Sequence, residues 1–189
     1  MTSTNSTLAT TGTSTTGLPL KAGEWGLDPL HSEVGFTIRH LGISKVRGAF
    51  RDFDASLSVG ATLADIAITA TVKLASIDTG NPDRDDHVRS PELMDVASRP
   101  EMTFRSTGIS GAGDDWTMAG DLTIGDVTRA VTLAVEFGGV VDSVVDGRRH
   151  AGFEATGEIR RGDFGLKFAP GLLGEVVKIA LDMQFVEPE

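Results

Sequence analysis

The chain has 189 residues, a net charge of −10 and no cysteine. This length suits one domain with a full hydrophobic core, and the lack of thiols excludes disulfides and thiolate metal sites. The acidic balance argues against a nucleic-acid partner and against electrostatic docking to an anionic membrane surface.

The first seventeen residues contain eleven Ser or Thr and no apolar run. They lack the basic start and the apolar segment of a signal peptide. We therefore expect a flexible Ser/Thr-rich tail over residues 1–20, one domain over 21–189, and a cytoplasmic protein. No later segment approaches the roughly 18 uninterrupted apolar residues that span a bilayer, so we expect no stable membrane insertion.

From Trp25 onward, apolar residues recur at every second position, which predicts strands. A change of phase between Phe50 and Phe53 predicts a bulge there. Almost no helical pattern separates the runs, so antiparallel pairing is favoured over parallel βαβ units. Eight strands of this length favour a closed barrel over a sandwich, because a barrel leaves no open edge. The eight runs cover 31–41, 48–59, 64–77, 101–109, 116–124, 129–139, 150–160 and 175–186.

The alternation stops over residues 76–100, where we expect one or two short helices inserted near residues 82–97. Ser90 is a suitable cap for a helix over 90–97, and Pro91 suits its first position. A second short helix is expected near Pro82–Val88. The segment 40–48 is expected to form no more than a helical turn, because it is short and bounded by glycine.

The same stretch gathers charged side chains, and Asp85 with Arg84 and His87 could form an acid/base set. The chain has no nucleophile elbow, HExxH, Walker A loop or GxGxxG motif. Ion pairs that brace a loop are the simpler interpretation, so we expect no catalytic residue and no enzymatic activity. A small enzyme using His40 or His87 with Asp85 remains the alternative. The histidines are far apart in sequence, and we expect no metal site.

The inward-facing positions combine bulky apolar residues with the small residues Ala70, Gly120, Ala155 and Gly157. Small residues among large ones suit a tapering packed core, but they can equally leave a slot. An eight-stranded barrel lies at the boundary between a filled interior and one that holds a small ligand. The alternation alone leaves both arrangements open.

Four segments carry a resemblance to a known family. WGLDPLHSEVGFTIRHLGISKVRGAF (25–50) resembles the amino-terminal signature of the YceI-like family. ASIDTGNPDRDDHVRSPELMDVASRPEMTFRST, GDLTIGDVTRAVTLAVEF and GFEATGEIRRGDFGL then follow in the family's order. Family members usually carry an aromatic pair where this chain has Leu93 and Met94, and adaptable side chains there could widen the mouth of a pore.

The resemblance implies an extended lipocalin-like antiparallel barrel with a long apolar pore. It also implies binding, and carriage or storage, of a polyprenyl lipid or isoprenoid quinone, with no other cofactor and with homodimers as one assembly. A ligand-free, stress-related interaction protein with a filled barrel is a further alternative. The expected pore lining is Phe36, Ile38, Phe50, Phe53, Leu57, Ile68, Val72, Phe104, Leu122, Ile124, Val135, Phe153, Phe164 and Ile179. The expected contacts at the pore mouth or head group are Arg39, His40, Arg84, His87, Leu93 and Met94.

Overall fold

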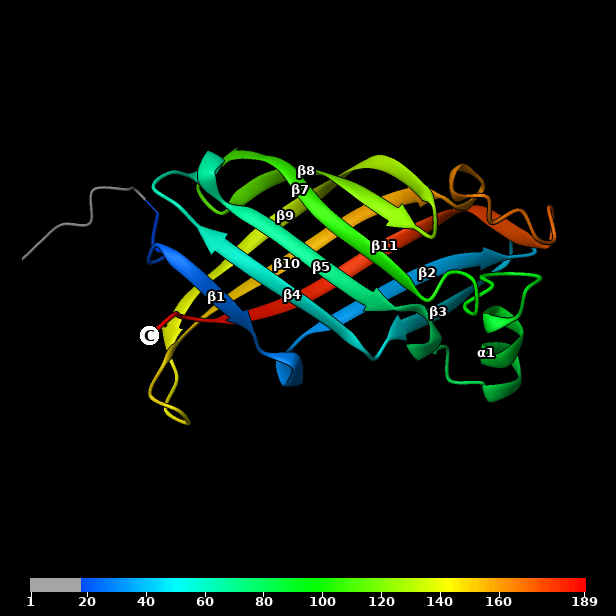
Figure 1. Ribbon diagram of the computed structural model, residues 1–189, viewed down its shortest axis with the longest axis horizontal. Coiled ribbons are helices and arrows are strands. Elements are labelled where there is room, and N and C mark those ends of the chain that lie inside the picture. The colour runs from blue at the N-terminus through cyan, green and yellow to red at the C-terminus, as the bar shows by residue number, and fades with distance from the viewer. Residues whose placement is uncertain (1–17) are drawn as a thin grey trace, which may run out of the picture.

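A closed ring of antiparallel strands dominates residues 18–189, the part of the chain that this computed structural model describes (Figure 1). Most of the predicted tail, residues 1–17, lies outside the described residues. Leu20 is only 3% exposed and packs in the barrel core, and Leu18 packs against the same core. Ordered structure therefore begins no later than Leu18.

The strands are long in the second half of the chain and short in the first. Within residues 18–189 the single α-helix is α1 (Pro82–Arg89), and short 3-10 turns cover Pro29–His31, Leu63–Asp65, Leu74–Ser76 and Arg161–Phe164. The strands are β1 (Gly23–Leu27), β2 (Glu33–His40), β3 (Ser44–Phe50), β4 (Phe53–Val59), β5 (Ala67–Lys73), β6 (Ile77–Asp78), β7 (Glu101–Ala112), β8 (Asp115–Ile124), β9 (Val127–Asp142), β10 (Arg149–Arg160) and β11 (Leu173–Val186).

Eight of these strands form the ring, in the order β1-β4-β5-β7-β8-β9-β10-β11, and β11 closes it by pairing with β1. The other three strands extend the ring at the end that carries α1: β2 pairs with β11, β3 with β2, and β6 with β3. β1 and β2 both lie along β11, so they act as two parts of one long strand. The predicted antiparallel eight-stranded barrel is confirmed.

Two local predictions for the first half of the chain turn out differently. The change of phase between Phe50 and Phe53 marks the break between β3 and β4, where Arg51 and Asp52 bend the chain. The expectation for residues 40–48 was wrong from Ser44 onward. Residues 41–43 form a hairpin turn, and Ser44–Phe50 is a strand because it pairs along its whole length with β2.

The expected helix near Pro82 is present as α1. Asn81 caps it, because the side-chain oxygen accepts a hydrogen bond from the Arg84 amide at 3.0 Å. The expected helix over 90–97 is absent, and those residues form successive turns. Ser90 has an extended ψ of 161°, as expected for a residue before proline, and Asp95 has φ of 47°, which a helix does not accommodate. No helix in residues 18–189 is long and apolar enough to cross a membrane.

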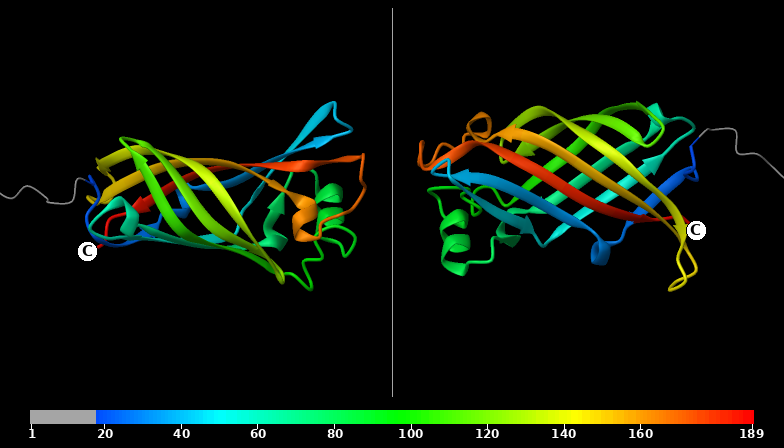
Figure 2. Two further views of the ribbon diagram at one scale, coloured as in Figure 1. Left: turned by 90° about the horizontal axis from the view of Figure 1, so that it is seen from above. Right: turned by 180° about the vertical axis from the view of Figure 1, so that it is seen from behind.

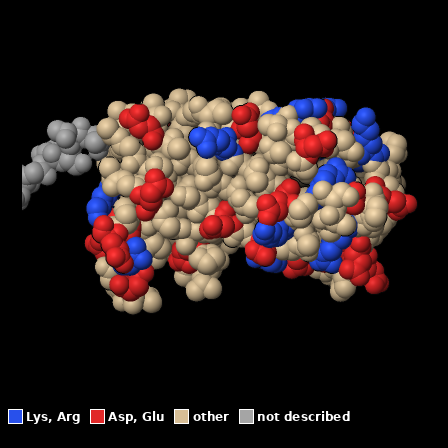
Figure 3. Space-filling model, in the orientation of Figure 1, with Lys and Arg blue, Asp and Glu red and all other residues tan. Residues whose placement is uncertain are grey.

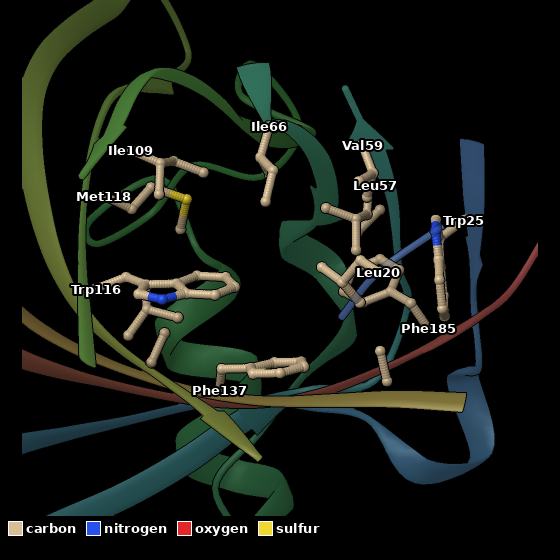
Figure 4. Packing of buried hydrophobic residues seen from close by; sticks show 14 of the residues in the cluster. Leu20, Trp25, Leu57, Val59, Ile66, Ile109, Trp116, Met118, Phe137 and Phe185 are labelled. Atoms are coloured by element: carbon tan, nitrogen blue, oxygen red, sulfur yellow. The ribbon is translucent and has the colours of Figure 1, made fainter. Parts of the chain in front are cut away.

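Two apolar clusters pack inside the barrel. The first lies around β1 and includes Trp25 and Phe185, which are almost fully buried (Figure 4). In the same cluster Trp116 of β8 stacks on Phe137 of β9, with ring centroids 5.3 Å apart. The second lies near α1 and includes Leu74 and other apolar residues of the adjacent strands. Aromatic side chains therefore pack at one end of the barrel, and the candidate site extends from there towards the other end.

Candidate functional site

The barrel encloses an apolar cavity of about 680 Å³. This size falls within the range of about 300–1,000 Å³ that is typical of small-molecule sites. Its wall is formed by side chains from every strand of the ring except β1, and it continues towards α1 and the connection between β10 and β11. Side chains therefore do not fill the whole barrel interior.

Most of the predicted lining residues do lie on the cavity wall. They are Phe36, Ile38, Phe50, Phe53, Ile68, Val72, Phe104, Leu122, Ile124, Val135, Phe153 and Ile179. Leu57 and Phe164 were wrongly placed on the wall. Each is 1% exposed, Leu57 within the cluster around β1 and Phe164 within the cluster near α1, so both are packed core residues.

The small residues of the barrel interior divide into two kinds. Ala70 and Ala155 lie on the cavity wall, where they leave space. A Cβ at Gly120 would collide with the ring of Phe104, and one at Gly157 would collide with Leu133. The alanines thus contribute to the cavity, whereas the two glycines admit large neighbours into a packed wall.

Polar side chains gather at the α1 end of the cavity. His40, Ser44 and Lys45 come from the β2–β3 hairpin, while Arg84 and His87 come from α1. Leu93 and Met94 also lie on the wall at this end, as predicted, and no Asp or Glu of the described residues lines the cavity. Arg39 was predicted at the mouth but is exposed and off the wall, because it alternates with the inward-facing Ile38 and His40.

Hydrogen bonds from the charged cluster hold α1 in place. Asp85 is 6% exposed and its Oδ1 accepts hydrogen bonds from the Thr79 amide at 2.9 Å and hydroxyl at 2.6 Å. Arg84 donates to the Thr79 hydroxyl at 2.7 Å and carbonyl at 2.8 Å. Bonds from the Gly80 amide and from Arg51 lower the pKa of Asp78. Asp85 thus braces the loop, and neither His40 nor His87 is among its hydrogen-bond partners in residues 18–189.

A contact between His87 and Phe168 joins the two sides of the mouth. The rings meet edge to face, with centroids 5.2 Å apart at 85°, and both residues line the cavity. His87 Nε2 also lies 2.9 Å from a carboxylate oxygen of Glu92. α1 therefore touches the loop between β10 and β11 across the mouth of the cavity.

The sequence interpretation missed Arg161, a cation on the cavity wall that is only 5% exposed. Its guanidinium donates to three backbone carbonyls, those of Gly174 at 2.9 Å, Leu166 at 2.6 Å and Leu173 at 3.3 Å. These bonds hold the loop that forms one side of the mouth. The signal was present in the sequence, because Arg161 continues the inward phase of Ile159 at the end of β10.

The four histidines form two separate pairs. His40 and His87 line the cavity, while His31 and His150 lie on either side of Asp28, at 2.9 Å and 3.7 Å from its carboxylate. No group of three or more metal-ligating side chains comes together within residues 18–189. The pair around Asp28 ties the short turn after β1 to β10.

Comparison with known proteins agrees with this geometry. Residues 25–185 match the family model of the YceI-like domain. Protein YceI of Escherichia coli is 37% identical over 158 residues, which cover 83% of this chain and 82% of that protein. The crystal structure of the Campylobacter jejuni YCEI protein superposes with a TM-score of 0.71 at 32% identity, over 86% of this chain and 97% of that one.

A more distant structure shares the fold. The polyisoprenoid binding domain from Saccharophagus degradans has a TM-score of 0.66 at 14% identity, over 89% of this chain and 100% of that one. Its likeness concerns the barrel architecture alone, whereas the family match spans almost all of the described residues. The chain belongs to the YceI-like family.

Proposed function

We propose that this protein binds a long-chain isoprenoid-type lipid in its barrel cavity and carries or stores it. The observation that supports this most directly is the distribution of polarity, with an apolar wall along the barrel and polar side chains confined to one end. An amphiphile has the same division between tail and head. The Saccharophagus degradans domain of similar fold, which is described as polyisoprenoid-binding, supports the same class of ligand.

The charges at the mouth favour a head group that accepts hydrogen bonds or carries negative charge. Lys45, Arg84 and Arg161 line the cavity together with two histidines, and no carboxylate among the described residues does so. This arrangement contrasts with a chain whose net charge is −10. Quinone carbonyls or a prenyl phosphate would match such donors, with the tail extending towards Trp116 and Phe153.

The free energy of transferring a lipid between a membrane and the barrel cavity suits a carrier. Each buried methylene contributes about 0.8 kcal/mol relative to water, so a tail of tens of carbons would exceed the practical ceiling of about 18–21 kcal/mol. The competing environment is a membrane, however, which is equally apolar. Transfer between membrane and barrel is then nearly balanced, and selectivity comes from the cavity shape and from the head group at the mouth.

The test is to purify the protein, extract it with organic solvent and identify the extracted lipid by mass spectrometry. An Ala70→Phe variant places a ring in the cavity and should retain much less lipid. Ala134→Phe is the matched control, because Ala134 is exposed on the outer face of β9. A prenyl lipid in near-equal molar ratio, lost only in Ala70→Phe, supports the proposal. A clean extract, with no uptake of added quinone or prenyl phosphate, would refute it.

A further inference from the structure

The β2–β3 hairpin projects beyond the barrel end (Figure 2). Its tip carries exposed apolar side chains. Leu41 is 54% exposed and Ile43 is 82% exposed. Leu172, 39% exposed, lies beside them on the neighbouring loop, where its carbonyl accepts a hydrogen bond from the Leu41 amide at 2.7 Å. These three residues, the apolar tip, lie at the rim of the cavity mouth, because Leu172 also lines the cavity.

The turn at this tip holds a leucine in an unfavourable conformation. The Ile43 amide donates to the His40 carbonyl at 3.2 Å, and the two central residues, Leu41 and Gly42, have φ of 51° and 71°. Positive φ at both central positions is typical of a type I′ turn, which favours Asn-Gly. A bulky residue at positive φ is uncommon. Folding alone therefore gives no reason for an exposed leucine here.

Unpaired cations surround the apolar tip. Arg39 lies directly opposite Lys45 across the hairpin, with Arg47 two residues further along the same strand. Residues 39–47 contain no Asp or Glu, and exposed Lys167 lies in the loop that carries Leu172. None of these four cations forms an ion pair within residues 18–189, and directly opposed like charges repel. In Figure 3, blue side chains lie among red ones over the end that carries α1.

We propose that the apolar tip and its four cations dock this protein on an anionic phospholipid surface, with the cavity mouth facing the membrane. Interfacial binding combines a small inserted apolar surface with cations that attract anionic lipids. Three apolar side chains are too few for a specific protein interface, which needs about 800 Å² on each partner.

The whole-chain charge predicts no such docking, but the distribution of charge over the surface changes that expectation. Exposed carboxylates such as Asp86 and Glu92 lie even at the α1 end, so the projecting hairpin, whose residues 39–47 carry no carboxylate, is the part that can approach an anionic membrane closely. Repulsion elsewhere thus favours one orientation. Lys45 and Leu172 also line the cavity, but the other five docking residues do not. This inference therefore goes beyond the lipid-carrier proposal, since docking does not depend on the content of the cavity.

The test is co-sedimentation with vesicles of phosphatidylglycerol and phosphatidylcholine in equal parts, compared with vesicles of phosphatidylcholine alone. Leu41→Asn with Ile43→Thr removes the apolar tip with residues suited to the turn, and should weaken binding at least about tenfold. Arg39→Gln and Arg47→Gln should each weaken it about fivefold. The matched control is Val144→Asn with Val145→Thr, which changes two exposed apolar residues in the β9–β10 hairpin.

A second readout uses the absence of cysteine in the chain. An environment-sensitive dye at Ile43→Cys should shift to the blue when anionic vesicles are added, and the same dye at Val144→Cys should not. Equal binding to both vesicle types, equal loss in the control variant, or self-association of the protein that disappears with Leu41→Asn and Ile43→Thr would overturn the proposal. Vesicle binding by a protein whose solvent extract is clean would support docking while refuting lipid carriage.

Discussion

Arg161 gives the sharpest test of how the cavity mouth is held together. Replacing it with methionine keeps an unbranched side chain of similar length but removes every donor. The carbonyls of Gly174, Leu166 and Leu173 then lose their partners. Exchanging a buried charge for an apolar group can be neutral when the partner is replaced as well. These backbone carbonyls remain, so we expect a net loss of stability.

The magnitude follows from the bond lengths. The bonds at 2.9 Å and 2.6 Å are good charge-assisted bonds, and the bond at 3.3 Å is weak. Two bonds to a charged donor contribute about 1.5–3 kcal/mol each, so Arg161→Met should lower the free energy of unfolding by about 3–6 kcal/mol. With about 2–4 °C per kcal/mol for a chain of this size, the melting temperature should fall by at least about 6 °C.

The assay is urea unfolding followed by the fluorescence of Trp25 and Trp116, which lie in the distant cluster around β1. Arg160→Met is the matched control, because Arg160 is the adjacent residue, is exposed and forms no ion pair within the described residues. It should change stability by less than about 0.5 kcal/mol. If the two variants unfold at the same urea concentration, the loop does not depend on the guanidinium and the reasoning fails.

Three further predictions concern other parts of the chain. Leu41→Asn should raise the free energy of unfolding by about 1 kcal/mol, because asparagine tolerates positive φ; an unchanged or lower melting temperature would contradict the strained turn. Phe168→Ala should open the contact with His87, and an added lipid should enter and leave faster in stopped-flow measurements, while equal rates would show that this contact is no barrier. Hydrogen bonds from the Arg148 amide, His150 and Ser143 lower the pKa of Asp146 below its ordinary 3.8. The stability that this carboxylate contributes is present when the pH is above its ordinary pKa of 3.8, and it is lost as the pH falls below that value. Asp146→Asn should therefore reduce the decline of the urea midpoint below about pH 5. If the midpoint declines equally steeply with pH in both proteins, the prediction is wrong.

Much of the barrel could be predicted from alternation alone, because each strand has one face towards the interior. The first part of β3, residues 44–47, was missed since its formation depends on pairing with β2, such as Ile38 opposite Val46. The choice between the two candidate helices depended on Ser90, whose extended backbone before Pro91 ends α1. Local composition around Ser90 also suits a helix start, so only the tertiary context distinguishes the two.

The sequence could predict which residues of the candidate site face the barrel interior, but not which of them border the cavity. The alternation of apolar residues at every second position indicates that Leu57 faces inward. It does not show whether an inward residue meets open space or another side chain. Leu57 lies directly opposite Trp25 in the cluster around β1, and so it is packed. Arg161 shared the inward phase of β10 but was not considered, because a buried arginine needs acceptors from a loop whose path the sequence does not reveal.

The closing strand has a consequence for the order in which the chain can fold. β11 consists of Leu173–Val186, and it pairs with β1 and β2, which lie far away in the sequence. The Gln184 amide, for example, donates to the Ser32 hydroxyl across 152 positions of sequence. A nascent chain therefore exposes the unpaired edges of β2 and β10 until β11 has been synthesised. Such distant pairings slow folding, so loss of β11 should leave an open sheet that is prone to aggregate.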